Sequence, residues 1–210
     1  MNSIMTGKNS NGSTDQSRRN LLKLAATGLL AGMVAPLVDL GSPMAAGLAL
    51  QGKNVLTVYY SWTGNTRLMA GIINEMVGGD MVRIETVAPY PTEYRETTKQ
   101  ARKELESGFK PPLTTRLTNI DTYDVIFVGS PCWWGTIATP VISFLSGYDL
   151  SGKTLVPFMT HKGSGLGRTV AHVRELCPAS AVLQGKALWG DSASKSEKEI
   201  SDWLRSLNMA

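Results

Sequence analysis

The segment with the clearest chemical character is rich in hydroxyl groups and small residues: Ser61-Trp62-Thr63-Gly64-Asn65-Thr66. A run of β-forming residues, 54–60, precedes it, and apolar residues at helical spacing follow it over residues 66–77. In such a strand–turn–helix unit, backbone N–H groups and hydroxyls converge where the helix N-terminus favours an anion. The segment therefore predicts a phosphate site. The alternative is an ordinary helix start with Thr63 or Asn65 as its N-cap.

The residues around Gly64 do not fit two common phosphate-binding motifs. No Lys follows Gly64, as a P-loop would require, and the dinucleotide fingerprint needs more than the single Gly found here. The S-x-T-G-N-T pattern of residues 61–66 instead resembles the phosphate loop of flavodoxins, which holds the phosphate of flavin mononucleotide (FMN). The resemblance extends over residues 54–207. It implies an FMN-binding electron-transfer protein in which this loop binds the cofactor.

A second distinctive segment follows the third expected strand and contains two adjacent tryptophans, which are costly to expose on a connection. A flat aromatic ligand would stack on them, although they could also cover the end of the core. The segment resembles the second flavin-binding loop of flavodoxins. This resemblance implies that Trp134 stacks on the flavin ring and that the peptide of Gly135 turns toward it. It also places three neighbours in the site, Pro131, Cys132 and Trp133.

A third segment, residues 160–167, follows the fourth expected strand, and its glycines permit close approach of the backbone to a ligand. The residues expected to line the site here are His161, Gly163, Ser164 and Gly165. Flavodoxins often carry a Tyr in this loop, but this segment has no aromatic residue. We therefore expect one face of the flavin to be less covered. His161 and Lys162 should also make the reduced, anionic flavin easier to form than in an ordinary flavodoxin.

Strand-like and helical patterns alternate along the chain, which predicts an α/β fold with a doubly wound, flavodoxin-like, five-stranded parallel sheet and helices on both faces. The expected strands are 54–60, 81–85 (at an edge), 124–129, 154–159 and 182–188, and the expected helices are 66–77, 94–106, a segment after Pro140, 166–176 and 194–207. Ligands bind such sheets at the carboxyl ends of the strands. The loops after the first, third and fourth strands should therefore meet. Helix 94–106 is expected to be solvated, with Tyr94, Ala101 and Leu105 on its apolar stripe.

The first 49 residues differ in composition from the rest of the chain. Arg18-Arg19 precede a mildly apolar run, residues 24–38, and a small-residue segment, residues 41–49. This is the order of a signal peptide, and the arginine pair resembles a twin-arginine signal. The glycines and Pro36 make the run a poor permanent span, although an uncleaved anchor is the alternative. We expect a signal and linker at 1–49, a flavodoxin-like domain at 50–210, and an exported, periplasmic or otherwise extracytoplasmic protein.

Charge and cysteine content limit the partners. The first 46 residues hold four basic and two acidic residues, so the remainder has 17 basic and 15 acidic residues and a formal charge of +2. Near neutrality argues against nucleic acid as a partner. Cys132 and Cys177 are expected at opposite edges of the sheet, too far apart for a disulfide. Two cysteines and two histidines without clustered spacing offer no metal site.

Three functions are compatible with these observations. The first is an electron carrier that serves a redox partner protein or a small quinone-like acceptor. The second is an FMN-dependent NAD(P)H:quinone-type oxidoreductase, which the missing aromatic favours because a hydride donor must reach an open flavin face. Short length and the absence of a nicotinamide-binding motif favour the first. The third is a binding module of the same fold that has lost its flavin.

Overall fold

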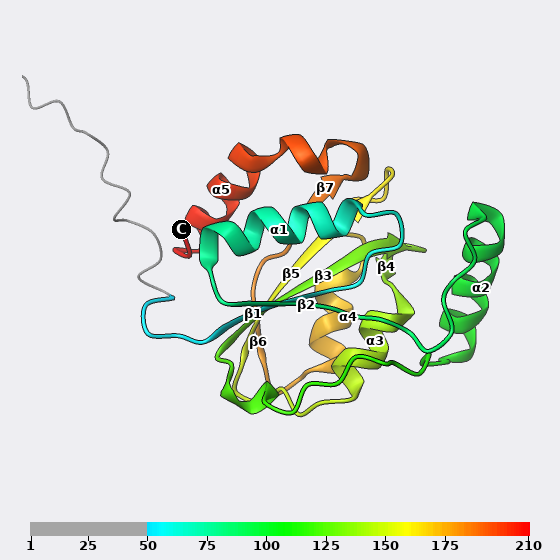
Figure 1. The fold of residues 1–210 in the computed structure, drawn as a ribbon, viewed down its shortest axis with the longest axis horizontal. Helices are drawn as coiled ribbons and strands as arrows, with labels where there is room; N and C mark the ends of the chain where they lie inside the picture. The colour runs from blue at the N-terminus through cyan, green and yellow to red at the C-terminus, as the bar shows by residue number, and fades with distance from the viewer. Residues whose placement is uncertain (1–49) are drawn as a thin grey trace, which may run out of the picture. The chain divides into compact units, whose positions relative to one another are not determined.

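The computed structural model describes residues 50–210, so the predicted signal segment lies outside the described residues. One sheet carries strands in the order β2-β1-β3-β5-β6, and neighbours along this path are parallel. Four strands of this path are β1 (Val55–Tyr59), β2 (Asp80–Arg83), β3 (Val125–Trp133) and β5 (Thr154–His161). Two short strands, β6 (Ala181–Val182) and β7 (Lys186–Trp189), share the fifth position beside β5 (Figure 1). The predicted parallel sheet and the edge position of β2 are confirmed.

The fifth strand differs from the expected continuous run at 182–188. Pairing with β5 stops after Val182 and resumes at Lys186. Leu155 accepts the N–H of Leu183 through its carbonyl, and Pro157, two residues further, presents its backbone to the same neighbour. Proline has no N–H to donate, so the ladder is interrupted opposite it.

Helices cover both faces of the sheet, as predicted (Figure 1). On one face, α1 (Asn65–Val77) and α5 (Glu197–Ser206) pack on alternate residues of the central strands. This core includes Met69 and Ile73 of α1, Ile200 of α5, and Phe127 and Phe158 of the sheet. On the other face, α3 (Thr139–Ser146) and α4 (Thr169–Leu176) contribute to a second core with Ile126, Leu155, Val141, Phe144 and Val173. The alternation along β3 thus buries both sides of a central strand.

Helix α2 (Tyr94–Ser107) stands to one side of the sheet, toward the end where β3 and β4 turn (Figure 1). Its buried residues are Thr97, Ala101 and Glu104, whereas Tyr94 is 65% exposed. The expected apolar stripe is therefore wrong at Tyr94. Instead, α2 packs on the domain through a partly polar seam formed by Thr97, Ala101 and Glu104.

Strand β3 runs four residues beyond the expected strand and reverses into the antiparallel β4 (Thr136–Ile137). Two 3₁₀ segments, η2 (Ile120–Thr122) and η3 (Gly190–Lys195), complete the regular structure of residues 50–210. Both Cys132 and Cys177 are free thiols. Within residues 50–210, no helix combines the length and hydropathy needed to cross a bilayer.

Candidate functional site

The first loop forms an open helix start at the carboxyl end of β1. Gly64 occupies the N-cap position of α1 with φ of 96° and makes no side-chain cap, so the alternative of Thr63 or Asn65 as N-cap is wrong. A positive φ of this size is readily adopted only by glycine. Within residues 50–210, the N–H groups of residues 62–66 find no protein acceptor. These free donors and the helix dipole favour an anion at this position, so the loop is a candidate anion site.

Buried hydroxyls lie behind these amides. Ser61, Thr66 and Thr160 are 3%, 1% and 4% exposed, respectively. The Ser61 hydroxyl accepts the N–H of Arg67 at 3.2 Å, and the hydroxyls of Thr66 and Thr160 lie 2.8 Å apart. Since Thr160 ends the buried part of β5, this pair joins the first loop to the third. Thr63, by contrast, is exposed to solvent.

The amide of Asn65 lies against the start of η3. A Cβ placed on Gly190 would lie 2.7 Å from Asn65 Nδ2, so only a glycine fits there without a shift. The same position lies 3.5 Å from the carbonyl oxygen of His161. Asn65 therefore lies against Gly190, the first residue of η3, and does not cap its own helix.

The second loop is a tight hairpin between β3 and β4. Trp134 and Gly135 have φ of 52° and 77°, which is typical of a two-residue type I′ turn. The Trp134 indole N–H donates to the carbonyl of Thr98 on α2 at 3.0 Å, and the Arg102 guanidinium lies 4.9 Å from its ring. With these contacts made, 54% of Trp134 is still exposed. A large part of the indole is free for a flat ligand.

Trp133 has a different role from Trp134. Its ring packs edge-on against Tyr60 and Tyr90, with centroids 5.5 Å and 4.9 Å away. It packs at the margin of the core. The alternative that the tryptophans cover the end of the core is therefore correct for Trp133. Cys132 lies beside this tryptophan. Burial is the largest effect on its thiol and raises the pKa of Cys132, although the Ser164 hydroxyl and the Gly135 backbone are near enough to lower it, so the thiol is protonated at neutral pH.

The third loop packs against the second, as expected. The N–H of Arg168 donates to the Gly135 carbonyl at 2.8 Å, and a Cβ on Gly167 would lie 2.1 Å from that oxygen. Half-buried Pro131 pairs with Thr160 across the two strands that lead into these loops. Gly163 and Gly165 have φ of 119° and 60°, and Ser164 between them is the contact to Cys132. The three loops predicted to meet therefore do so.

The third loop gains an aromatic neighbour that sequence reasoning missed. Trp189 ends β7 opposite His161, and the two rings meet edge-on with centroids 5.5 Å apart. It is 48% exposed, and its indole lies 4.0 Å from a Cβ placed on Gly163. The expectation of a less covered flavin face did not include this residue. Its signal was an aromatic residue directly after the fifth expected strand, 182–188.

The basic residues of the third loop are less available than expected. The Lys162 ammonium lies 3.3 Å from the Asp191 carboxylate, in a pair exposed to solvent. The His161 ring accepts the N–H of Gly163 at 2.9 Å through Nδ1. Asp191 partly offsets the charge of Lys162, so the expected effect of Lys162 on an anionic ligand is weakened.

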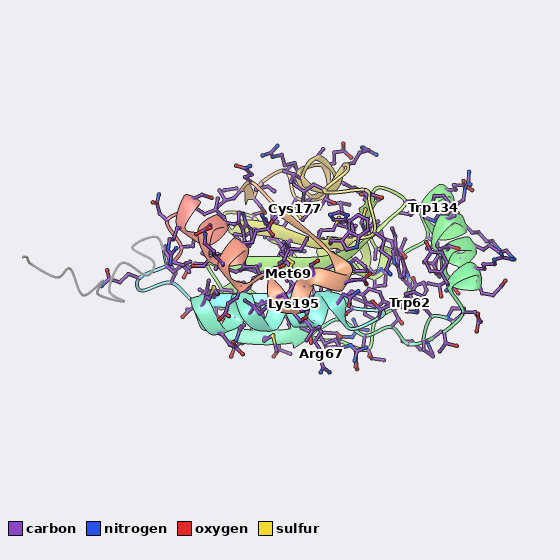
Figure 2. The ribbon with its side chains drawn as sticks, turned by 90° about the horizontal axis from the view of Figure 1, so that it is seen from above. Trp62, Arg67, Met69, Trp134, Cys177 and Lys195 are labelled. Carbon is purple, nitrogen blue, oxygen red and sulfur yellow. The ribbon has the colours of Figure 1, made fainter. Side chains whose placement is uncertain are left out.

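Trp62 extends the aromatic surroundings toward α2. Its indole N–H donates to the Pro91 carbonyl at 2.9 Å, and its ring lies 6.3 Å from that of Tyr94. Figure 2 shows Trp62 and Trp134 at the same end of the domain, the end where α2 lies. The candidate site thus combines a helix start, with N–H groups unpaired within residues 50–210, and partly exposed aromatic rings at the carboxyl edge of a doubly wound sheet, the ligand position of this class of fold.

Comparison with known proteins identifies the family of the chain. The sequence model of the flavodoxin family matches residues 54–207, and the chain belongs to this family. It is similar to a candidate flavoprotein from Bacteroides eggerthii, with 30% identity, a TM-score of 0.66, and coverage of 73% of this chain and 97% of that chain. A candidate flavoprotein from Bacteroides uniformis shares 25% identity, with a TM-score of 0.66 and coverage of 73% and 98%.

A third solved structure contains a ligand. The flavoprotein from Lactobacillus acidophilus in complex with FMN shares 26% identity, with a TM-score of 0.56 and coverage of 68% of this chain and 97% of that chain. No curated protein matches the chain.

Proposed function

We propose that this protein binds FMN and carries electrons, as an exported member of the flavodoxin family. The observation that carries the proposal is the helix start at Gly64, where backbone N–H groups that find no acceptor within residues 50–210 lie in the same loop as the buried hydroxyls of Ser61 and Thr66. Such a site holds a terminal phosphate through neutral donors. No lysine of the P-loop kind is needed there.

The residues on the ring side also fit FMN. Trp134 presents an indole that is more than half exposed, Trp62 lies on the first loop, and Trp189 ends β7 beside His161 of the third loop. Offset stacking on a flat heteroaromatic ring would bury these surfaces. Bound FMN would supply one- and two-electron transfer, and the chain would position the ring and exclude water from it. The FMN complex of the similar Lactobacillus acidophilus flavoprotein supports this assignment.

Location and partners are part of the proposal. The twin-arginine-like segment around Arg18 and Arg19 favours export of the folded, cofactor-loaded protein. Outside the cytoplasm, nicotinamide cofactors are scarce, which favours a carrier over a reductase. The electron partner would be a redox protein or a small quinone-like molecule.

The test is the absorbance spectrum of the full chain purified under native conditions, followed by titration of the apoprotein with FMN, FAD and riboflavin. We expect a flavin spectrum and tighter binding of FMN than of the other two, because the loop is built for a terminal phosphate monoester. A colourless protein that takes up no FMN would instead identify a module without flavin.

A second measurement separates the two flavin-dependent functions. Steady-state oxidation of NADPH in the presence of a quinone should be negligible for a carrier. Rapid turnover would favour the NAD(P)H:quinone-type oxidoreductase.

A further inference from the structure

We propose that Thr160, at the carboxyl end of β5, is a positioning residue for the phosphate of FMN. It would act through Thr66, by fixing the direction in which the Thr66 hydroxyl donates its proton. The inference rests on the proposed function, since it concerns the same anion site. Thr160 lies outside the phosphate-loop pattern, and its role follows only from the three-dimensional contact.

The contact is short and almost completely buried. Thr66 and Thr160 are 1% and 4% exposed, and their hydroxyl oxygens lie 2.8 Å apart. Both residues are fixed by regular structure. Thr66 belongs to the first turn of α1, and Thr160 pairs with Pro131 on β3 and with Leu188 on β7. Groups held on rigid elements of this kind can orient a ligand without paying much conformational entropy.

The count of donors and acceptors gives the pair a direction. Each hydroxyl has one proton, and the single hydrogen bond between the two oxygens uses only one of these two protons. Among residues 50–210, neither hydroxyl has another hydrogen-bond partner. One proton is therefore left to point elsewhere. The backbone N–H of Thr66 is one of the amides without an acceptor in the described part of the chain, so an anion bound at the helix start would lie beside this residue.

An anion at that position settles the orientation. A phosphate oxygen accepts, so Thr66 donates to it, and the Thr66 oxygen is then free to accept from Thr160. The resulting chain runs from Thr160 to Thr66 to the phosphate, and each bond polarises the next. Without the Thr160 proton, the Thr66 hydroxyl loses the partner that holds its rotamer and its donor direction.

The experiment compares FMN and riboflavin binding to the full-length apoprotein by fluorescence titration. Thr160→Val keeps the shape and removes the hydroxyl, and we expect FMN binding to weaken roughly three- to ten-fold while riboflavin binding stays unchanged. Thr160→Ser should restore FMN affinity because it returns the proton. Thr66→Val should weaken FMN roughly ten-fold or more, and adding Thr160→Val to it should cost little, since the two act as one chain.

The matched control is Thr57→Val. Thr57 is a fully buried threonine of β1 whose hydroxyl has no partner among the described residues. Its replacement should leave both affinities unchanged. If Thr160→Val does not fold, as judged by urea unfolding, Thr160→Ala is measured in its place.

Two results would overturn the inference while leaving the proposed function intact: a Thr160 variant with wild-type FMN affinity, or one that weakens FMN and riboflavin equally. Failure of Thr160→Ser to restore binding would also contradict it. A wild-type chain that takes up no FMN would contradict the proposed function itself, and this outcome is visible before any variant is made.

Discussion

Trp134 adopts a backbone conformation that a bulky side chain rarely takes, with φ of 52°. Left-handed backbone costs a non-glycine residue roughly 1–2 kcal/mol. Two contacts from α2 offset this cost, namely the hydrogen bond to the Thr98 carbonyl and the Arg102 guanidinium over the ring. Type I′ turns favour Asn or Gly at this position, so the tryptophan is retained at the expense of turn stability. Strain of this kind is typical of functional sites.

The first prediction at the residue scale is that Trp134→Phe weakens FMN and riboflavin to the same degree. The indole contacts the ring part of the ligand, which the two flavins share, and phenylalanine stacks less and cannot donate to Thr98. We expect about 1 kcal/mol lower stability of the apoprotein from the lost hydrogen bond. Flavin titration and urea unfolding measure the two effects.

Trp203→Phe is the control for this prediction. Trp203 also donates its indole N–H to a carbonyl, that of Gln184, but it lies on α5 in the opposite core. This variant should lower stability without changing flavin affinity. If Trp134→Phe weakened only FMN, or weakened neither flavin, Trp134 would not be the stacking residue.

At the scale of elements, α2 depends on a buried carboxylate. Glu104 is 6% exposed and accepts hydrogen bonds from Tyr90, Thr139 and Gln100. Burial is the largest cause that raises the pKa of Tyr90, followed by its hydrogen bond to Glu104, so this phenol stays protonated and remains a donor. The seam joins α2 to the start of α3. It thereby fixes the helix that supports Trp134.

We predict that Glu104→Ala lowers the free energy of unfolding by roughly 1–3 kcal/mol, because Tyr90 and Thr139 lose the carboxylate that accepts from both, and only one of the two hydroxyls can donate to the other. Flavin affinity should fall with it, since α2 no longer supports Trp134. Glu106→Ala is the control on the same helix: its ion pair with Arg102 is exposed, and its loss should change stability by less than about 0.5 kcal/mol. Equal effects of the two substitutions on unfolding in urea would contradict the role given to the seam.

A histidine of α4 that contacts the hairpin makes the stability of the fold depend on pH. His172 Nδ1 lies 2.7 Å from the Thr136 hydroxyl of β4. Burial is the main cause that lowers the pKa of His172 below its ordinary value of 6.5; Glu175 opposes this shift and Arg168 adds to it. The unfolded chain therefore binds the proton more readily than the folded one. It follows that this residue contributes stability above about pH 6.5 that is lost as the pH falls toward the folded pKa.

His172→Gln should flatten this dependence. We expect the wild-type free energy of unfolding to decrease below about pH 6.5, and the variant to decrease less over the same window. Urea unfolding at several pH values between about 5 and 8 measures the slope, with His161→Gln as the control for the second histidine. A slope that is the same in wild type and His172→Gln would show that another group causes it.

Sequence patterns predicted the elements well where local signals decide them. The continuous apolar run of β3 and the hydroxyl-rich turn at Gly64 are local features, and both lie where expected. Features set by tertiary contacts were missed. Trp189 reaches the site only through its pairing with His161, and Glu104 is buried only because Tyr90 and Thr139 are brought to it. The break in the fifth strand depends on Pro157 in its neighbour, so it too required the strand order.

At the scale of the whole molecule, the candidate site exists only in the folded chain. Its loops follow β1, β3 and β5, and the contacts between them join residues far apart in sequence, such as Thr66 with Thr160 and Gly135 with Arg168. A cofactor held non-covalently by such a site binds after folding and stabilises the folded state by mass action. Export of an unfolded chain would lose it. A pathway that moves folded proteins would keep it.

The last prediction therefore concerns export, and it rests on Arg18 and Arg19, which lie outside the described residues. Replacing both with lysine keeps the positive charge but removes the arginine pair that a twin-arginine signal requires. We expect the double variant to collect in the cytoplasm as a precursor that carries flavin, while the wild-type chain reaches the periplasm in its loaded form. Fractionation followed by flavin absorbance of each fraction measures this, and Lys8→Gln, which leaves the arginine pair intact, is the control. Unimpaired export of the double variant would exclude the twin-arginine route, and the protein would then have to acquire its FMN after crossing the membrane.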